Sequence, residues 1–531
     1  MTARPPRPAR CAARRAGWLV LAALAACSAP PPADGAGPGG TAPAGGAVAD
    51  LPAPLAGAEA ERALAEVGFS LDWLDWLSED VVRGGDTLRF VWIYAEPVGR
   101  GGAGRPDEPP DPAHPYAHVG DDDEGIACVD DAARAAVLHL RHYEATGSAR
   151  SRRSAVKLLR FVRALQAESG LFYNFVWDRS LRVNTEHPNS VADEVSWWTA
   201  RAVWALGEGA RVLAESDPAE AGAALDAVRR VEPHLDRLLA RYPETADEGG
   251  RRFPQWLLYG TASDATSELL LGLAAVERAA PSAAGARRLR RFAEGVAGLR
   301  FGSLRASPYG GHASWAGGWH GWGNSQSQAL AGAARWGLAG PDALASAQAE
   351  ARTLYARLLV EGWLHAVDYE TGEERRFEQI AYDVRPVAVG LVRLYEATGE
   401  ARYAVQAGLA ASWLRGANPA GATMADPATG RGYDGVLGPD RVNWNAGAES
   451  TVEAQMTLLE VALHPAAARW LGARPAPPAT VRHDGRTLRA RAFTGGRGGA
   501  AVVALDVAAD SSAVWTGADA ERILDAAGGP R

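Results

Sequence analysis

The stretch Cys128-Val-Asp-Asp-Ala-Ala-Arg-Ala-Ala-Val-Leu-His-Leu-Arg-His-Tyr143 predicts a helix with a polar start. It opens with two adjacent carboxylates, Asp130 and Asp131, and Arg134 follows one turn later. Apolar residues recur behind them at helical spacing, namely Ala133, Val137, Leu140 and Tyr143. This pattern indicates a helix that buries one face and exposes carboxylates at its beginning.

The same plan occurs six times along the chain: a loop with aromatic residues, a short polar cluster, and an alanine- and leucine-rich amphipathic helix. The polar clusters begin near Asp130, Asp193, Asp264, Asn324, Asp383 and Glu449. The helices are expected at 132–146, 195–207, 266–279, 326–336, 387–398 and 451–463. Repeats of this size cannot bury their apolar faces alone and must stack on their neighbours.

A second set of helices, richer in arginine, separates these six. They are expected at 152–166, 219–240, 284–296, 341–359 and 401–414, and the segment 57–77 would supply a sixth. Small alanine-rich helices suit an inner ring, and arginine-rich ones suit an outer face. The sequence therefore predicts an all-α fold, an (α/α)6 toroid of six helical hairpins spanning residues 57–470, although the segment 86–94 has the composition of a strand.

The two ends of the chain differ from this helical region in composition. Residues 1–27 carry a basic start, a short apolar run and the sequence Leu24-Ala25-Ala26-Cys27, which resembles a bacterial lipobox whose cysteine is lipidated. An ordinary secretory signal is the alternative. Residues 28–56 are rich in Pro, Gly and Ala and predict a disordered tether. Residues 474–531 predict a small β-rich segment.

Composition limits the partners of this chain. Its formal net charge is −8, and the leader holds arginines, so the mature protein would be more acidic still. An acidic protein without a basic aromatic patch is a poor ligand for nucleic acid, which we exclude as a partner. If Cys11 is cleaved off and Cys27 is lipidated, Cys128 has no partner for an internal disulfide. We expect a monomer that contacts the membrane only through its lipid.

Five acids at the predicted helix starts are candidate catalytic residues: Asp130, Asp131, Asp193, Asp383 and Glu449. Parallel inner helices would bring all six starts to one end of the ring. A pair of carboxylates there can act as general acid and general base, because one can donate a proton while the other activates water. Helix capping is the alternative for each of them, with Arg134 pairing with an acid and Ser190 forming a capping box with Asp193. A capping box of Ser450 with Glu453 would leave Glu449 free to point inward.

Aromatic and polar residues near the same helix starts are candidate sugar-binding residues, because an indole covers a sugar ring and a polar group binds its hydroxyls. They are Trp177, His187, Glu194, Trp197, Asp264, Trp315, Trp319, Trp322, Asn324, Tyr382 and Trp444. For Asp264, a helix cap is an equal alternative. The glycine-rich run from 315 to 326 is the densest aromatic segment of the chain.

The motifs that usually indicate a cofactor or catalytic metal do not occur: HExxH, CxxC, a Walker loop or GxSxG. We therefore expect no cofactor and no metal. The run Asp121, Asp122 and Asp123 is expected to be a solvated loop, with a structural calcium site as the alternative.

Over residues 60–465 the sequence resembles the six-hairpin glycosidase superfamily. The resemblance rests on the six-fold helix plan, the Asp130-Asp131 start, the Tyr433-Asp-Gly435 loop and the segment 445–453. It implies an exported glycoside hydrolase, lipid-anchored through Cys27 on the periplasmic or outer cell surface, that acts on a poly- or oligosaccharide and usually inverts the anomeric centre.

In that hypothesis Asp130, Asp131 or Asp193 protonates the leaving oxygen, and Asp383 or Glu449 activates water across the ring. One alternative is a polysaccharide lyase on the same toroid, which would use a tyrosine or histidine from the set Tyr259, Tyr309, Tyr382, His187 and His320. Others are a non-catalytic glycan-binding lipoprotein and, on the strength of the Asp-Asp start, a toroid resembling terpene cyclases.

Overall fold

The computed structural model describes residues 51–99, 101–107, 109–110 and 115–526. The predicted signal peptide, the lipidated Cys27 and nearly all of the predicted tether lie outside the described residues. The described chain belongs to one compact unit, Asp50–Arg531. Within it no helix has the length and apolar character needed to cross a membrane.

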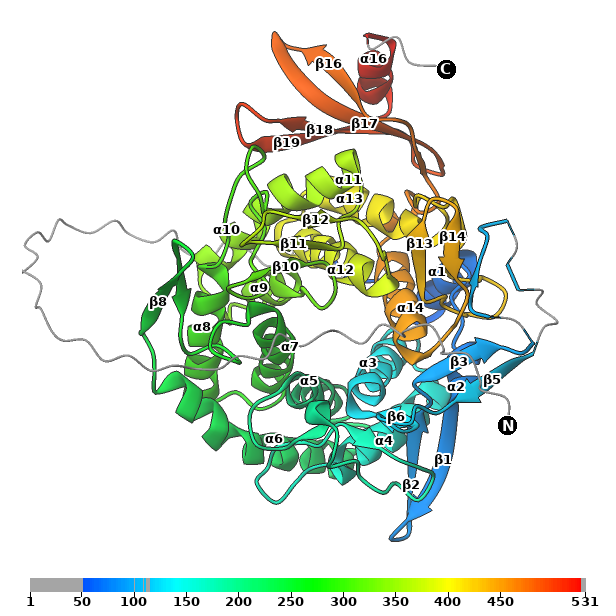
Figure 1. Ribbon diagram of the computed structural model, residues 1–531, viewed down its shortest axis with the longest axis vertical. Coiled ribbons are helices and arrows are strands. Elements are labelled where there is room, and N and C mark those ends of the chain that lie inside the picture. Colours follow the sequence, from blue (N-terminus) through cyan, green and yellow to red (C-terminus); the bar gives the residue numbers. More distant parts are fainter. Residues whose placement is uncertain (1–50, 100, 108, 111–114, 527–531) are drawn as a thin grey trace, which may run out of the picture. The chain divides into compact units, whose positions relative to one another are not determined.

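Six helices form a closed inner ring, in which each packs on the next and the last returns to the first (Figure 1). In ring order they are α3 (Val129–Thr146), α5 (Trp197–Val212), α7 (Ser263–Ala279), α9 (Gln326–Arg335), α12 (Ala381–Thr398) and α14 (Ala448–Ala462). Each of the six predicted inner helices is present. The predicted toroid is therefore confirmed by the contacts within this chain.

Small side chains let the inner helices approach closely, most clearly where α5 meets α7. A Cβ atom on Gly207 would lie 2.6 Å from the carbonyl oxygen of Gly272, and one on Gly272 would lie 2.6 Å from the backbone nitrogen of Trp204. Real Cβ atoms do not come so near backbone atoms, so only glycine fits at this crossing.

The outer helices connect successive members of the inner ring. They are α4 (Ala149–Ala164), α6 (Pro218–Leu239), α8 (Ala283–Ala297), α10 (Pro341–Glu350), a π-turn (Ala351–Tyr355), α11 (Ala356–Glu361) and α13 (Ala401–Ala411) followed by a 3-10 turn (Ser412–Leu414). The expected helix at 57–77 is broken into α1 (Gly57–Glu66) and α2 (Asp72–Leu77). Because α1 packs on both α3 and α14, it occupies the sixth outer position. The short α15 (Pro465–Ala468) packs on α13 and α14.

The all-α description is incomplete, because the described residues also contain seven small β-sheets. Those before α15 are built from β1 (Ser78–Arg83), β2 (Asp86–Val91), β3 (Tyr94–Pro97), β4 (Ala103–Gly104), β5 (Tyr116–Val119), β6 (Ala127–Cys128), β7 (Phe175–Val176), β8 (Thr245–Glu248), β9 (Arg251–Pro254), β10 (Gly318–His320), β11 (Ala366–Asp368), β12 (Glu374–Arg375), β13 (Gly435–Gly438) and β14 (Arg441–Asn443). All pairings are antiparallel, and most join short segments of the connecting loops. The loops before the inner helices are thus held by strand pairing.

The predicted β-rich segment at the C-terminus is a five-stranded antiparallel sheet with a helix. It comprises β15 (Arg474–Pro475), β16 (Ala479–His483), β17 (Arg486–Gly496), β18 (Gly499–Asp506), β19 (Ser511–Thr516) and α16 (Ala518–Ala526). One face has a small core of its own that includes Val481, Leu488 and Ile523. Phe493 and Val503 instead belong to the main core, and the sheet packs on α11.

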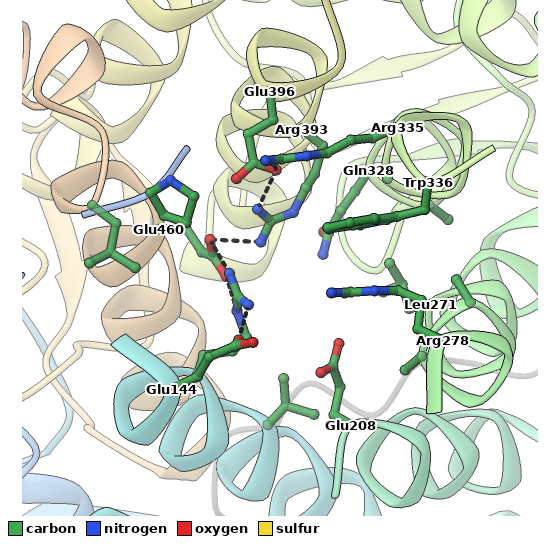
Figure 2. A pocket seen from close by; sticks show the side chains of 18 of the residues that line it. Glu144, Glu208, Leu271, Arg278, Gln328, Arg335, Trp336, Arg393, Glu396 and Glu460 are labelled. Carbon is green, nitrogen blue, oxygen red and sulfur yellow. Dashed lines mark hydrogen bonds and ion pairs between the residues drawn. The ribbon is translucent and has the colours of Figure 1, made fainter. Parts of the chain in front are cut away.

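The two ends of the inner ring differ. At the N-terminal ends of the inner helices lie the predicted acids, and the loops rim that end. At the C-terminal ends the ring encloses a cavity of about 340 Å³ (Figure 2).

Candidate active site

Four of the predicted acidic helix starts lie in the first turn of an inner helix: Asp130 in α3, Asp264 in α7, Asp383 in α12 and Glu449 in α14. Asp193 does not. The helix α5 begins only at Trp197, because Ser196 caps it by accepting a hydrogen bond from the Thr199 backbone.

The predicted capping box of Ser190 with Asp193 is therefore wrong. The Ser190 hydroxyl instead accepts hydrogen bonds from the backbone N–H groups of Asn174 and Phe175, at 3.0 and 2.9 Å. Asp193 and Glu194 lie exposed in the loop before α5.

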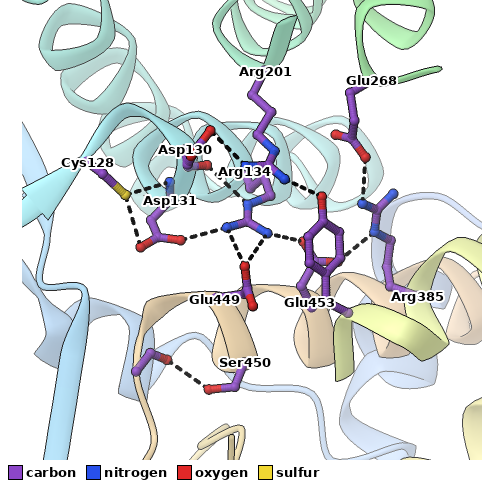
Figure 3. Close-up of polar contacts among 12 residues, drawn as sticks. Cys128, Asp130, Asp131, Arg134, Arg201, Glu268, Arg385, Glu449, Ser450 and Glu453 are labelled. Carbon is purple, nitrogen blue, oxygen red and sulfur yellow. Dashed lines mark hydrogen bonds and ion pairs between the residues drawn. The ribbon is translucent and has the colours of Figure 1, made fainter. Parts of the chain in front are cut away.

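About one helical turn after its start, each inner helix contributes one polar side chain to a buried layer, which we name the ionic layer. Its members are Arg134, Arg201, Glu268, Gln328, Arg385 and Glu453, and each is at most 5% exposed. All but Gln328 appear in Figure 3. Three guanidinium groups thus face two carboxylates and an amide across the centre of the ring.

Direct hydrogen bonds join five members of the ionic layer, and the sixth, Arg201, pairs with Asp130 at the helix start. Arg385 donates to Glu453 at 2.6 Å, to Glu268 at 3.0 Å and to Gln328 at 2.7 Å. Arg134 donates to the other oxygen of Glu453 at 2.9 Å. Each buried charge therefore has an opposite charge in contact, which is the condition for burying ions at all. These are the residues that sequence reasoning missed, apart from Arg134.

Arg134 also connects the ionic layer to the acids at the helix starts. Its Nη2 atom lies 2.8 Å from Asp131 Oδ1 and 3.2 Å from Glu449 Oε2 (Figure 3). The two carboxylates come from α3 and α14, the first and last helices of the ring. They are therefore no farther apart than the sum of those two distances.

Glu449 is the most open carboxylate among the predicted helix-start acids that lie within the ring. Its side chain is 47% exposed, although protein surrounds it within the ring. This enclosure raises the pKa of the Glu449 carboxyl, Arg134 opposes the rise, and Asp131 adds to it. A carboxyl that is open to solvent and has a raised pKa is suited to donate a proton.

Asp130 is the second carboxylate within reach of solvent, at 19% side-chain exposure. Its Oδ1 lies 2.8 Å from Arg201 Nη1, and its Oδ2 accepts a hydrogen bond from Asn174 Nδ2 at 3.1 Å. The same Arg201 donates to the Tyr382 hydroxyl at 2.5 Å. Asp130 is therefore held in a fixed orientation beside a buried positive charge.

Asp131 is placed differently from what we expected. It is 3% exposed, Arg134 binds one of its oxygens, and the Cys128 thiol donates to the other at 3.2 Å. Burial raises the pKa of Asp131 and Arg134 opposes this. Asp131 therefore supports Arg134 from a buried position, and a catalytic role for this carboxylate stays a prediction.

Two histidines are held by aspartates at the starts of α7 and α12. His320 Nε2 lies 2.9 Å from Asp264 Oδ2, and His365 Nδ1 lies 3.5 Å from Asp383 Oδ2. Asp383 is 1% exposed and also accepts a hydrogen bond from the Ile380 backbone. Asp383 is therefore a buried partner of His365, and its predicted catalytic role stays a prediction. His365 lies 18 residues before Asp383 in another loop. Because this spacing fits no known motif, the sequence did not indicate His365 as a site residue.

Aromatic rings gather beside these groups. Trp322 stacks on His320 with ring centroids 3.7 Å apart, and Trp197 lies 5.7 Å from Trp322. Tyr259 is 42% exposed, and its hydroxyl accepts a hydrogen bond from the Trp197 backbone at 3.0 Å. Trp315 is 38% exposed, and its ring centroid lies 5.3 Å from that of His320. These rings offer faces on which a sugar could stack.

Other expected binding residues are buried. Trp319 is 2% exposed and Trp444 is 1% exposed, with its indole donating to the Arg105 carbonyl. Asn324 is 5% exposed, and Tyr382 is 2% exposed. This burial leaves little of these side chains open to a sugar, and their direct contact with one stays a prediction.

The remaining candidates belong to two loops. Trp177 lies under Arg182, and His187 packs edge-on against Phe175, both in the loop between α4 and α5. Asp121 uses one carboxylate oxygen to accept hydrogen bonds from the backbone N–H groups of Asp123 and Glu124, which closes a turn. Within the described residues no three His, Cys, Asp or Glu side chains are grouped as metal ligands.

Asp434 is a carboxyl group that the sequence indicated only through the Tyr433-Asp-Gly435 loop. Burial raises its pKa to about 7, and the carboxylates Glu378 and Glu449 contribute to the rise. The Ser450 hydroxyl donates to Asp434 at 2.8 Å. The proposed capping box of Ser450 with Glu453 is therefore replaced by a bond to Asp434.

The chain matches no protein-family model, and no curated protein matches its sequence. Among solved structures it is similar to cellobiose 2-epimerase from Spirochaeta thermophila DSM 6192, at 13% identity over 76% of this chain and 96% of that chain, with a TM-score of 0.46. A D-mannose isomerase has 13% identity, the same coverage and a TM-score of 0.47. The GH family 9 endoglucanase J30 has 17% identity over 76% of this chain and 84% of that chain, with a TM-score of 0.41. Similarity this distant identifies neither a family nor a reaction.

Proposed function

We propose that this protein is a glycoside hydrolase in which Glu449 is the general acid and Asp130 the general base. One observation carries the proposal. Two carboxylates open to solvent, from the neighbouring helices α3 and α14, are each fixed by a buried arginine of the ionic layer. Hydrolysis of a glycosidic bond needs such a pair, one to protonate the leaving oxygen and one to activate water.

The environments of the two carboxylates differ in the way these roles require. The raised pKa of Glu449 keeps a proton available for the leaving oxygen. Arg201 places positive charge 2.8 Å from Asp130, which suits a carboxylate that orients and deprotonates water. Asn174 fixes the second oxygen of Asp130, so the direction of attack is set before substrate arrives.

The aromatic rings support a carbohydrate substrate. Trp197, Trp322 and Tyr259 lie at the same end of the ring as the two carboxylates, and Trp315 is partly exposed beside them. Indole and phenol faces bind the apolar faces of sugar rings. We propose an oligo- or polysaccharide substrate and inversion at the anomeric carbon, and a proton NMR time course of the first-formed anomer tests the latter.

Hydrolysis of a panel of glycans by the full-length protein tests the proposal. General acid–base catalysis contributes roughly 100- to 10,000-fold, so Glu449→Gln and Asp130→Asn should each reduce kcat by about that factor on a hydrolysed glycan. Glu215→Gln, in the exposed turn between α5 and α6, and Asp226→Asn, on the outer helix α6, change exposed acids away from this end and are matched controls. Full activity in either active-site variant would contradict the assignment.

A second candidate function is sugar isomerisation or epimerisation, favoured by the two histidine–aspartate pairs. Such reactions move a proton beside a carbonyl group, and a carboxylate-held imidazole suits that step. Asp383 raises the pKa of His365 against the effect of burial. Incorporation of deuterium from solvent into a free sugar, lost in His365→Asn but retained in Asp130→Asn, would favour this function over hydrolysis.

The lyase alternative has less support, because its base must lose a proton readily. Burial raises the pKa of Tyr382, and the hydroxyl of Tyr309 is bound by Glu374, which raises its pKa as well. Absorbance of an unsaturated sugar product would still detect it.

Export and lipid anchoring through Cys27 complete the proposal, and their support is the leader sequence alone. Radiolabelled palmitate should enter the wild-type protein and not Cys27→Ala. Equal labelling of both would contradict the anchor.

A further inference from the structure

The cavity at the C-terminal ends of the inner helices is separate from the candidate active site, because the ionic layer lies between them. Its volume is about 340 Å³, within the lower range of small-molecule sites. Arg141, Glu208, Arg335 and Glu460 each stand seven residues, or two turns, beyond a member of the ionic layer. Between the two levels the lining is apolar, formed by Val137, Trp204, Leu271 and Met456.

Each glutamate lining the cavity is neutralised by an arginine. Glu460 binds Arg141 at 2.9 Å and Arg393 at 2.6 Å, and Glu396 binds Arg335 at 2.7 Å.

Arg211, which lies just outside the cavity lining, neutralises the two remaining glutamates, Glu208 and Glu144. It binds Glu208 at 2.7 Å and also contacts Glu144. Four carboxylates therefore face four arginines in contact pairs, and a fifth arginine remains.

The fifth arginine is Arg278. No salt bridge or hydrogen bond joins it to another side chain in the described part of the chain, and its guanidinium carbon lies 4.0 Å from the centre of the Trp336 ring. Figure 2 shows Arg278 and Trp336 lying one above the other and pointing into the cavity. Burial and the nearby Arg211 lower the pKa of Arg278 to about 10, although Glu208 and Glu144, which Arg278 does not contact, oppose the fall; Arg278 stays charged at neutral pH.

Trp336 adds a feature that charge pairing does not explain. It is 51% exposed, the largest exposed fraction of any tryptophan among the described residues, yet it stands at the cavity wall. The guanidinium carbons of Arg278 and Arg335 lie 4.0 and 5.4 Å from the Trp336 ring centre, and about half of the residue stays exposed. This exposed indole surface beside Arg278 offers an apolar contact and a bidentate carboxylate contact to the same small molecule.

We propose that this cavity is a second binding site, for a monocarboxylate sugar of about the size of a hexuronic acid. The carboxylate pairs with Arg278, the sugar ring lies against Trp336, and the hydroxyls face the polar groups of Glu208 and Gln328. One unpaired arginine balances one negative charge, which favours a monoanion over a phosphate ester. The site does not depend on the reaction proposed for the opposite end.

Isothermal titration of the full-length protein with D-glucuronate tests the proposal. We expect saturable binding, at least tenfold weaker in Arg278→Gln and in Trp336→Ala, and no comparable binding of the neutral D-glucose. Arg278→Lys, which keeps the charge and loses the bidentate contact, should bind with intermediate affinity. Arg229→Gln, an exposed arginine on α6, is the matched control.

Glu449→Gln separates this site from the candidate active site. It should bind D-glucuronate as tightly as wild type does. Absence of D-glucuronate binding to wild type, unchanged affinity in folded Arg278→Gln, or loss of affinity in Glu449→Gln would each overturn the proposal. Circular dichroism of each variant establishes that it is folded.

Discussion

Arg134 on α3 donates hydrogen bonds to Glu449 on α14 at 3.2 Å and so ties the candidate acid to the seam where the ring closes. Arg134 also binds Glu453 on α14, and these two residues are 319 positions apart along the chain. The position of the proposed acid and the closure of the ring therefore depend on the same side chain.

Replacing Arg134 should change the pH dependence of activity. Arg134 holds the pKa of Glu449 down, so its removal raises that pKa further. A general acid works only when protonated, and the basic limb of the kcat/KM profile should consequently move to higher pH in Arg134→Lys, where the ammonium cannot reach all its carboxylates. A profile identical to that of wild type would argue against Glu449 as the acid.

The same residue should matter for stability. Arg134→Gln leaves the buried Asp131 and Glu453 carboxylates short of a partner, and breaking a buried ion pair costs about 3–5 kcal/mol. Urea unfolding should show this loss, whereas Arg229→Gln, an exposed pair on α6, should change the unfolding free energy by less than about 1 kcal/mol.

Asp434 should make folding sensitive to pH. Its pKa is about 7 in the folded protein against an ordinary value of 3.8, so the folded state holds a proton that the unfolded state releases. The folded state is therefore favoured most below pH 4, and this contribution falls as pH rises to about 7. The urea midpoint should decline less between pH 5 and 8 in Asp434→Asn than in wild type, and parallel curves would refute the shift.

The glycine contact between α5 and α7 predicts opposite effects for two alanine substitutions. Gly272→Ala places a Cβ 2.6 Å from the backbone of α5 and should destabilise the fold by about 1–3 kcal/mol. Gly222→Ala lies within α6 and meets nothing within 4 Å, so it should stabilise by about 0.5–1 kcal/mol through helix propensity. Thermal melts of both variants measure the difference.

Trp322 should contribute to substrate binding more than to the chemical step. Trp322→Ala removes one stacking face, worth about 0.5–1.5 kcal/mol, and should raise KM about two- to tenfold with a smaller change in kcat. Trp76→Ala, at another partly exposed tryptophan, is the control. A fall in kcat alone would instead indicate that Trp322 acts by positioning His320.

The ring itself could be predicted because its signal is local. Apolar residues at helical spacing define α3 through α14 one segment at a time, and a repeated plan implies stacking. The small sheets were mostly missed because they pair segments distant in sequence, such as β4 with β14. Two-residue strands like β6 and β7 carry no alternating pattern of their own.

The site was predicted in part, for a related reason. Glu449 and Asp130 stand at helix starts, where sequence reasoning looks for exposed acids. Arg201, Arg385 and Glu453 lie inside helices, where a charge usually indicates a solvated face, and only their mutual contacts make them a buried layer. The burial of Asp131 and Asp383 follows from partners on other segments, Cys128 and His365, which no spacing reveals.

The ionic layer also determines how a polymer could approach this ring. Its six side chains are each at most 5% exposed, and five of them are joined by hydrogen bonds that include three ion pairs. A polysaccharide therefore has no passage through the ring, and a product must leave by the side on which its parent entered. For the proposed glycan hydrolysis, this geometry predicts no threading of a chain through the ring, and each glycan would dock on the rim from outside.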